Sequence, residues 1–128
     1  MFVADLLKNL EIECEISFVK LSSYQGTETT GKVRELIGLT DSIEGRDVIV
    51  LEDIVDTGHT MCKMLETLKK QNPASVEVAS LFVKPERMQV HVDVKYSLFT
   101  IPDSFIVGYG LDYDGLGRNI PDVYDAVV

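Results

Sequence analysis

Cysteine is scarce in this chain, and so are long apolar runs. The two cysteines, Cys14 and Cys62, lie far apart and form no Cys-x-x-Cys pair, which argues against a disulfide or a cysteine metal site. No apolar run approaches the roughly 20 residues that a membrane-spanning helix needs. The N-terminal segment, Met-Phe-Val-Ala-Asp-Leu-Leu, has no basic region of the kind that begins a signal peptide. These absences favour a cytoplasmic protein that does not bind a membrane.

Basic residues are also few compared with acidic ones. There are 12 lysines and arginines against 21 aspartates and glutamates, which gives a net charge of −9 and argues against a nucleic-acid partner. The two histidines, His59 and His91, have no partner at the spacing of a zinc site. An acidic protein can still bind an anionic substrate where backbone amides, a lysine and Mg²⁺ reverse the local field. An anionic small molecule therefore stays open as a ligand.

The chain is expected to form one domain, residues 1–128, because this length and a hydrophobic content of 45% suffice for one packed core. Its patterns predict helices over 2–9 and 61–71, and strands over 12–21, 48–52, 76–83, 97–100 and 105–109. Residues 22–38 are predicted to be a long mobile loop ending in a short strand at 32–37, and 113–128 an irregular acidic tail. Strands that alternate with helices predict an α/β fold with a mostly parallel sheet flanked by helices.

The most informative segment is 48–61, Val-Ile-Val-Leu-Glu-Asp-Ile-Val-Asp-Thr-Gly-His-Thr-Met. A buried strand is expected to end at Glu52 and Asp53, and a short loop from Asp56 to Thr60 then leads into a helix. Such a loop presents free backbone N–H groups and the positive end of the helix dipole, which together bind phosphate. The neighbouring carboxylates add acceptors for a sugar diol, a partner for Mg²⁺ and a general base.

This segment resembles the phosphoribosyl pyrophosphate (PRPP) loop of type I phosphoribosyltransferases, and more narrowly that of the hypoxanthine (or hypoxanthine-guanine) enzymes. A second segment, Phe-Ile-Val-Gly-Tyr-Gly-Leu-Asp-Tyr at 105–113, is similar to a purine-binding segment of the same family. The resemblance implies transfer of the 5-phosphoribosyl group from PRPP to a 6-oxopurine, either hypoxanthine or guanine. The products would be IMP or GMP and pyrophosphate, the cofactor Mg²⁺, and the assembly a homo-oligomer, a dimer or a tetramer.

The resemblance also implies roles for residues of the first segment. Asp56 would be the general base or acid near purine N7, because a carboxylate can accept the purine proton. Glu52 and Asp53 would receive the ribose hydroxyls, with or without the metal. The residues implied for the 5′-phosphate are Asp56, Thr57, Gly58, His59 and Thr60.

Three residues are implied for the purine. Lys84 would donate to the oxygen at position 6, which selects 6-oxopurines because an ammonium can only donate. Phe105 would stack on the purine face, and the backbone of Ile106 would contact the base edge.

Four further residues are implied for pyrophosphate, the metal and a closing loop. Asp112 belongs with the purine-binding residues and would ligate a Mg²⁺ held by pyrophosphate, which Arg118 would also bind. Ser23 and Tyr24 match the start of a flexible loop that closes over the reacting atoms and excludes water.

The chain departs from the family at its beginning. Family members normally carry a further N-terminal segment with an early strand and a short glycine-containing loop that binds pyrophosphate. We expect either a fragment or a natural short form that completes its sheet by association, with lower activity than a complete enzyme. Two other functions stay open: a non-catalytic module that senses PRPP or a nucleotide, and an inert fragment.

Overall fold

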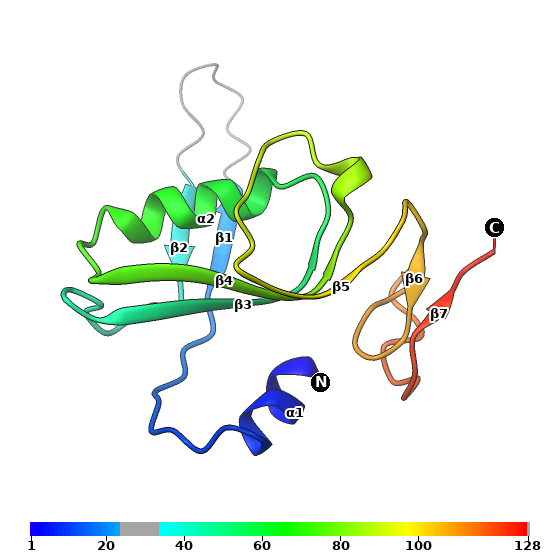
Figure 1. Ribbon diagram of the computed structural model, residues 1–128, viewed down its shortest axis with the longest axis horizontal. Helices are drawn as coiled ribbons and strands as arrows, with labels where there is room; N and C mark the ends of the chain where they lie inside the picture. Colours follow the sequence, from blue (N-terminus) through cyan, green and yellow to red (C-terminus); the bar gives the residue numbers. More distant parts are fainter. Residues whose placement is uncertain (24–33, 128) are drawn as a thin grey trace.

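The computed structural model describes residues 1–23 and 34–127. Its main sheet has three parallel strands in the order β3-β4-β5, beside two antiparallel pairs, β1 with β2 and β6 with β7. Helices α1 and α2 lie on opposite sides of the main sheet (Figure 1). The elements in chain order are α1 Phe2–Lys8, β1 Lys20–Ser23, β2 Arg34–Ile37, β3 Asp47–Val55, α2 His59–Lys69, β4 Ser75–Val83, the 3₁₀ turn η1 Pro85–Arg87, β5 Tyr96–Thr100, β6 Ile106–Val107 and β7 Tyr124–Asp125.

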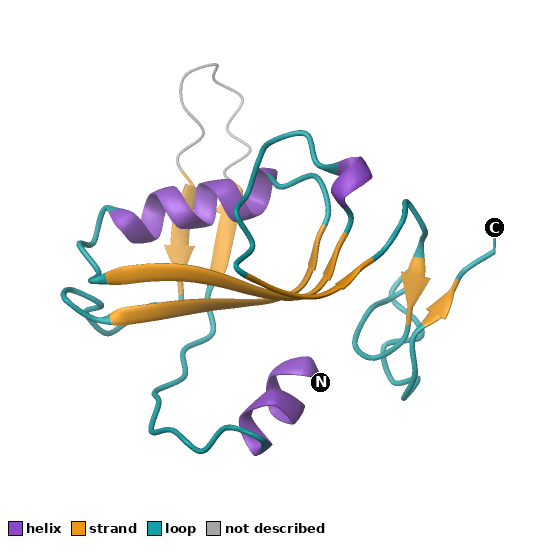
Figure 2. Ribbon diagram, viewed as in Figure 1, coloured by secondary structure: helices purple, strands orange, loops and turns teal. Residues whose placement is uncertain are grey.

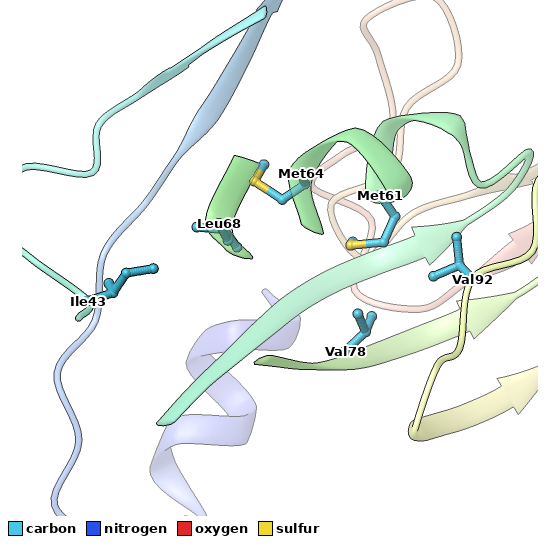
Figure 3. Close-up of a cluster of buried hydrophobic side chains, with 6 residues drawn as sticks. All are labelled: Ile43, Met61, Met64, Leu68, Val78 and Val92. Atoms are coloured by element: carbon cyan, nitrogen blue, oxygen red, sulfur yellow. The ribbon is translucent and has the colours of Figure 1, made fainter. Parts of the chain in front are cut away.

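The larger core lies between α2 and the sheet. Parallel neighbours need a crossover connection, and α2 supplies it between β3 and β4 (Figure 2). Three apolar residues at helical spacing, Met61, Met64 and Leu68, are buried on the face of α2 that covers the sheet. They pack with Val78 of β4 and with residues of two loops (Figure 3). This packing fixes the N-terminus of α2 at the carboxyl end of β3.

A second core lies on the other side of the sheet. Phe2 of α1 is buried against Leu81 and Phe82 of β4, and half-buried residues of the 101–111 segment join this cluster. The Tyr109 hydroxyl donates a hydrogen bond to the Asp5 carboxylate, which raises the pKa of Tyr109. Helix α1 therefore holds the segment that was predicted to bind the purine.

Most of the predicted elements are confirmed. The helix at 2–9 and the strands at 76–83 and 97–100 correspond to α1, β4 and β5, and the predicted helix at 61–71 begins earlier, at His59. The strand predicted at 32–37 is present as β2 from Arg34, and residues 32 and 33 lie outside the described residues. Strands β1 and β2 occupy the two ends of the predicted loop at 22–38.

The strand predicted over 12–21 is wrong for most of its length. Only its last two residues, Lys20 and Leu21, belong to β1. Ile12, Ile16 and Phe18 are exposed, and residues 12–19 pair with no strand in the described part of the chain, so an apolar pattern alone did not produce a strand here.

The strand predicted over 105–109 is also wrong in length and in sheet. Only Ile106–Val107 is a strand, and it pairs antiparallel with β7, which lies in the tail that was predicted to be irregular. Gly108 and Tyr109 have positive φ angles, 100° and 52°, which turn the chain out of an extended path. The main sheet therefore ends at β5.

None of the helices within residues 1–23 and 34–127 is long and apolar enough to cross a membrane.

Candidate active site

The candidate site is a pocket where the chain leaves β3 and enters α2. It has a volume of about 230 Å³ and is lined by Glu52, Ile54, Val55, Asp56, Thr57, Gly58, Thr60 and Met61. Five of the residues predicted from the sequence therefore share one cavity. Two other predicted residues are placed differently, since Asp53 of β3 does not line the pocket and His59, the first residue of α2, is exposed.

The N-terminus of α2 faces this pocket through Gly58. This residue is the N-cap and adopts a left-handed conformation with φ 89°, and as a glycine it has no side chain that could cap the first turn of the helix. The first-turn N–H groups and the positive end of the helix dipole are therefore available to an anion. The hydroxyls of Thr57 and Thr60 stand at the same pocket as further donors.

Glycine is required at position 58 for two reasons. Its φ lies where other residues are strained, and a Cβ would lie 2.4 Å from the Val90 carbonyl oxygen. The backbone of the 88–92 segment therefore touches the loop at this point, and any side chain would push the two apart.

We expect Gly58→Ala to lower the free energy of unfolding by about 1–3 kcal/mol, because it combines a strained φ with a backbone clash. It should also weaken binding of a phosphate at the N-terminus of α2, because the added methyl group displaces the loop. The matched control is Gly45→Ala, where φ is 71° but nothing lies within 4 Å of the added Cβ. Thermal unfolding with and without inorganic phosphate measures both effects. Equal behaviour of the two variants would contradict the required close contact.

The chain segment after β4 holds the loop between β3 and α2 in place through hydrogen bonds. The backbone N–H groups of Gln89 and Val90 both donate to the Thr57 carbonyl, at 2.9 and 3.2 Å. The side-chain oxygen of Gln89 lies 3.0 Å from Nε2 of His59. The Lys84 N–H donates to the Val55 carbonyl at 3.0 Å. The position of the loop is thus set by residues far from it in the sequence.

Asp56 is bound by an arginine that the sequence did not single out. The Nε of Arg87 donates to Oδ1 of Asp56 at 2.8 Å, and the same Nε lies 3.7 Å from Oδ1 of Asp103. Both carboxylates, Asp56 more strongly, raise the pKa of Arg87. The only hint in the sequence was an arginine shortly after Lys84, in the turn Pro85-Glu86-Arg87.

The two adjacent acids lie within β3 rather than at its end, which corrects the expected boundary at residue 52. The strand continues to Val55, and strand geometry points Glu52 and Asp53 toward opposite faces. Glu52 accepts a hydrogen bond from the Asp53 N–H at 3.1 Å. Burial, and then the hydrogen bond and charge of the Asp53 side chain, raise the pKa of Glu52 to about 8. Glu52 is therefore protonated at neutral pH and can donate as well as accept.

We expect Glu52 to make the protein less stable as pH rises. Its pKa is 4.5 when unfolded and about 8 when folded, so the native state binds the extra proton between these values and the free energy of unfolding falls across them. Glu52→Gln should remove this slope and be more stable than the unsubstituted chain at pH 8, by about 1–2 kcal/mol. At pH 4.5 the two proteins should have similar free energies of unfolding. Urea unfolding from pH 4.5 to 8.5 measures it, and a gap that stays constant with pH would contradict the raised pKa.

The residues predicted for the purine lie after β4 and before β6. Lys84 directly follows β4 and is only 6% exposed, and no acceptor among the described residues hydrogen-bonds or ion-pairs with its ammonium. Phe105 is 49% exposed, and its ring meets Tyr113 edge-on with centroids 5.7 Å apart. Ile106 is half-buried in β6. A buried ammonium and an exposed aromatic face are thus available to a ligand.

Asp112 and Arg118 are brought together in the turns after β6. An Arg118 nitrogen lies 3.2 Å from Oδ1 of Asp112, and the other terminal nitrogen donates to the Gly110 carbonyl at 2.8 Å. Asp112 also accepts from the Gly115 N–H at 2.8 Å. Asp112 therefore lies after β6, which belongs to the two-stranded sheet with β7 and not to the main sheet.

Two predicted sites have no complete counterpart in the described structure. No group of three acids, histidines or cysteines able to hold a metal ion is present among residues 1–23 and 34–127. Ser23 is the last residue of β1, and Tyr24 lies outside the described residues.

Comparisons with known proteins point to one family. Residues 1–114 match the family model of the phosphoribosyl transferase domain. The hypoxanthine-guanine phosphoribosyltransferase of Staphylococcus epidermidis is 46% identical over 122 residues, which are 94% of this chain and 68% of the relative. The enzyme of the same name from Staphylococcus aureus is 43% identical over the same shares.

Solved structures agree with the sequence comparisons. A crystal structure of a hypoxanthine phosphoribosyltransferase from Staphylococcus aureus has a TM-score of 0.82 at 41% identity and covers 97% of this chain and 68% of its own. A variant of the Trypanosoma cruzi enzyme, solved as a ternary substrates complex, has a TM-score of 0.87 at 33% identity over 97% and 68% of the two chains.

Proposed function

Since this chain belongs to the hypoxanthine-guanine phosphoribosyltransferase family, we propose that it transfers the 5-phosphoribosyl group from PRPP to a 6-oxopurine in purine salvage. The acceptor is hypoxanthine or guanine, and the products are IMP or GMP and pyrophosphate. One observation carries the proposal: the pocket at the end of β3 joins an uncapped helix N-terminus to the carboxylate of Asp56. This arrangement combines an anion site with an acid/base group in one small cavity.

In this proposal the turn between β3 and α2 holds the ribose phosphate. The N–H groups that follow Gly58, including that of His59, and the hydroxyls of Thr57 and Thr60 bind the 5′-phosphate oxygens. Glu52, which lines the pocket, contacts the ribose hydroxyls. Asp53 was expected to share this role, but it lies on the other face of β3 and outside the pocket, so the contact falls to Glu52. The protonated state of Glu52 suits this role, because a carboxylic acid can donate to one hydroxyl oxygen while it accepts from another group.

The purine lies between Lys84 and Phe105. The buried ammonium of Lys84 donates to the oxygen at position 6, and this contact gives the charge the partner that the described residues do not provide. Phe105 stacks on the purine with its ring held edge-on by Tyr113. The backbone of Ile106 contacts the base edge.

Asp56 handles the single proton of the reaction. The bond between the anomeric carbon and pyrophosphate breaks, and a bond from that carbon to a purine nitrogen forms. The purine ring must then lose a proton. A carboxylate near N7 accepts it and also opposes the positive charge that builds on the purine. In the reverse direction the protonated Asp56 returns the same proton.

The acids of the site fit Mg²⁺ as a cofactor that arrives with its substrate. Mg²⁺ is commonly held by one or two carboxylates together with phosphate oxygens and waters, so it needs no cluster of three acids. Asp112 would hold it, together with Glu52 on the ribose side, whose proton the metal would displace. When bound, the metal neutralises charge on the leaving pyrophosphate. Arg118, which forms an ion pair with Asp112, also binds the pyrophosphate.

Two further parts of the proposal concern the whole chain. Residues 1–128 act as one phosphoribosyltransferase-like domain. The chain also forms a homo-oligomer, supported by the exposed apolar side chains of Ile49, Leu98 and Phe99 along the main sheet. Sedimentation velocity at several concentrations tests this assembly.

The direct test is formation of nucleotide from hypoxanthine and from guanine with PRPP and Mg²⁺, followed by absorbance. Turnover supports the enzyme. If no nucleotide forms but GMP with Mg²⁺ still raises the melting temperature, the chain is a binding module of the same ancestry. If neither occurs, the chain is an inert member of its family.

A further inference from the structure

We propose that Arg87 is a positioning residue that fixes the Asp56 carboxylate and links it to the chain segment that leads into Phe105. The consequence for turnover rests on the proposed function. The link itself rests on the geometry of Arg87, Asp56 and Asp103 alone.

A single guanidinium serves carboxylates from two different loops. Asp56 belongs to the turn before α2, and Asp103 to the connection between β5 and β6. The Nε of Arg87 lies 2.8 Å from Oδ1 of Asp56 and 3.7 Å from Oδ1 of Asp103. The contact with Asp56 is a hydrogen bond, whereas the contact with Asp103, made by the same nitrogen, is an ion pair beyond hydrogen-bond distance. The delocalised charge of a guanidinium lets one side chain attract both carboxylates.

The second carboxylate connects Arg87 to the purine end of the site. Only Ser104 separates Asp103 from Phe105. The start of this connection is held to the sheet, because the Ile101 N–H donates to the Val83 carbonyl at 2.9 Å. Arg87 therefore connects the loop that holds the phosphate with the segment that leads to Phe105. These two parts of the site must be correctly placed relative to each other when both substrates are bound.

The contact is built for orientation more than for stability. The side chains of Arg87, Asp56 and Asp103 are 43%, 40% and 56% exposed, and exposed ion pairs add little to folding free energy. Arg87 donates to Oδ1 of Asp56, and no donor among residues 1–23 and 34–127 binds Oδ2, which is available for the purine proton. A fixed carboxylate with one free oxygen is what proton transfer at a defined atom requires.

The backbone of the loop does not depend on Arg87. Thr57 is held by the N–H groups of Gln89 and Val90, and Gly58 by its contact with the same segment. Loss of the Arg87 side chain should therefore leave the 5′-phosphate site intact and disturb only the direction of the Asp56 carboxylate.

The test compares Arg87→Gln and Arg87→Lys with Arg46→Gln in steady-state kinetics. Arg46 is a matched control, because its guanidinium forms an exposed ion pair of similar length, 2.9 Å to Glu15, away from the pocket. We expect Arg87→Gln to lower kcat about 10-fold or more, with KM for PRPP changed less than about 2-fold, and Arg87→Lys to recover part of the loss. The inference would be overturned if Arg87→Gln had the same kinetics as Arg46→Gln. It would also be overturned if Arg87→Gln raised KM and left kcat unchanged.

A second measurement needs neither substrate nor turnover. The carboxyl ¹³C resonances of Asp56 and Asp103 should both move in Arg87→Gln, and neither should move in Arg46→Gln. Movement of one alone, or of neither, would overturn the link between the two loops. If the unsubstituted chain forms no nucleotide, the proposed function fails, whereas the link is still decided by these resonances.

Discussion

Asp56→Asn is expected to lower kcat by about 10²–10⁴-fold while the protein still folds and binds nucleotide. An amide is similar in size to the carboxylate but cannot take up the purine proton or oppose positive charge on the ring. The 5′-phosphate is bound chiefly by backbone N–H groups of the α2 N-terminus, which the substitution leaves in place. Affinity for IMP, measured by calorimetry, should change less than about tenfold.

A suitable control is Asp47→Asn, which makes the same change of charge at the opposite end of β3. Asp47 accepts a hydrogen bond from Ser75 at 2.7 Å, so this variant shows what a lost surface contact alone does. Its kcat should stay close to that of the unsubstituted chain. If Asp56→Asn retains kcat, Asp56 is not the acid/base group, and another side chain must manage the proton.

Lys84→Met is expected to change stability and activity in opposite directions. The ammonium is buried and has no hydrogen-bond or ion-pair partner among the described residues, so an apolar side chain of similar length should raise the free energy of unfolding by about 1 kcal/mol. The same change removes a charge-assisted hydrogen bond to the 6-oxygen. It should therefore lower kcat/KM for hypoxanthine by about 10- to 100-fold. The ratio of kcat/KM for hypoxanthine to kcat/KM for adenine should decrease as well.

The control is Lys95→Met, since Lys95 is exposed and lies 3.8 Å from Glu77 on the sheet surface. That variant should leave kcat/KM unchanged. Denaturant unfolding and competition between hypoxanthine and adenine provide the two readouts. A large loss of stability in Lys84→Met would show that the ammonium supports the fold, and unchanged discrimination between the bases would remove Lys84 from the purine site.

Turnover, and not binding, separates an enzyme from a sensing module in these variants. In both cases Asp56→Asn should keep nucleotide binding and Lys84→Met should weaken it. Only an enzyme forms nucleotide in the unsubstituted chain and loses that turnover in both variants.

The sequence by itself determined the β3-α2-β4 unit and the loop inside it. The apolar run before Glu52, the glycine at position 58 and the helical spacing of Met61, Met64 and Leu68 are local patterns, and local patterns report backbone conformation directly. Lys84 was placed after β4 for the same reason. The similarity of these segments to one family was visible before any contact was known.

Tertiary structure alone decided how the site residues meet. The ion pairs of Arg87 with Asp56 and of Arg118 with Asp112 depend on loops whose approach no local pattern encodes. The raised pKa of Glu52 comes from burial within a strand longer than its apolar run suggested. Residues 12–19 and 105–109 have apolar patterns suited to strands, yet a strand also needs a neighbour with free N–H and C=O groups. Pairing and burial are properties of the assembled chain, so they follow from packing and not from the order of residues within one segment.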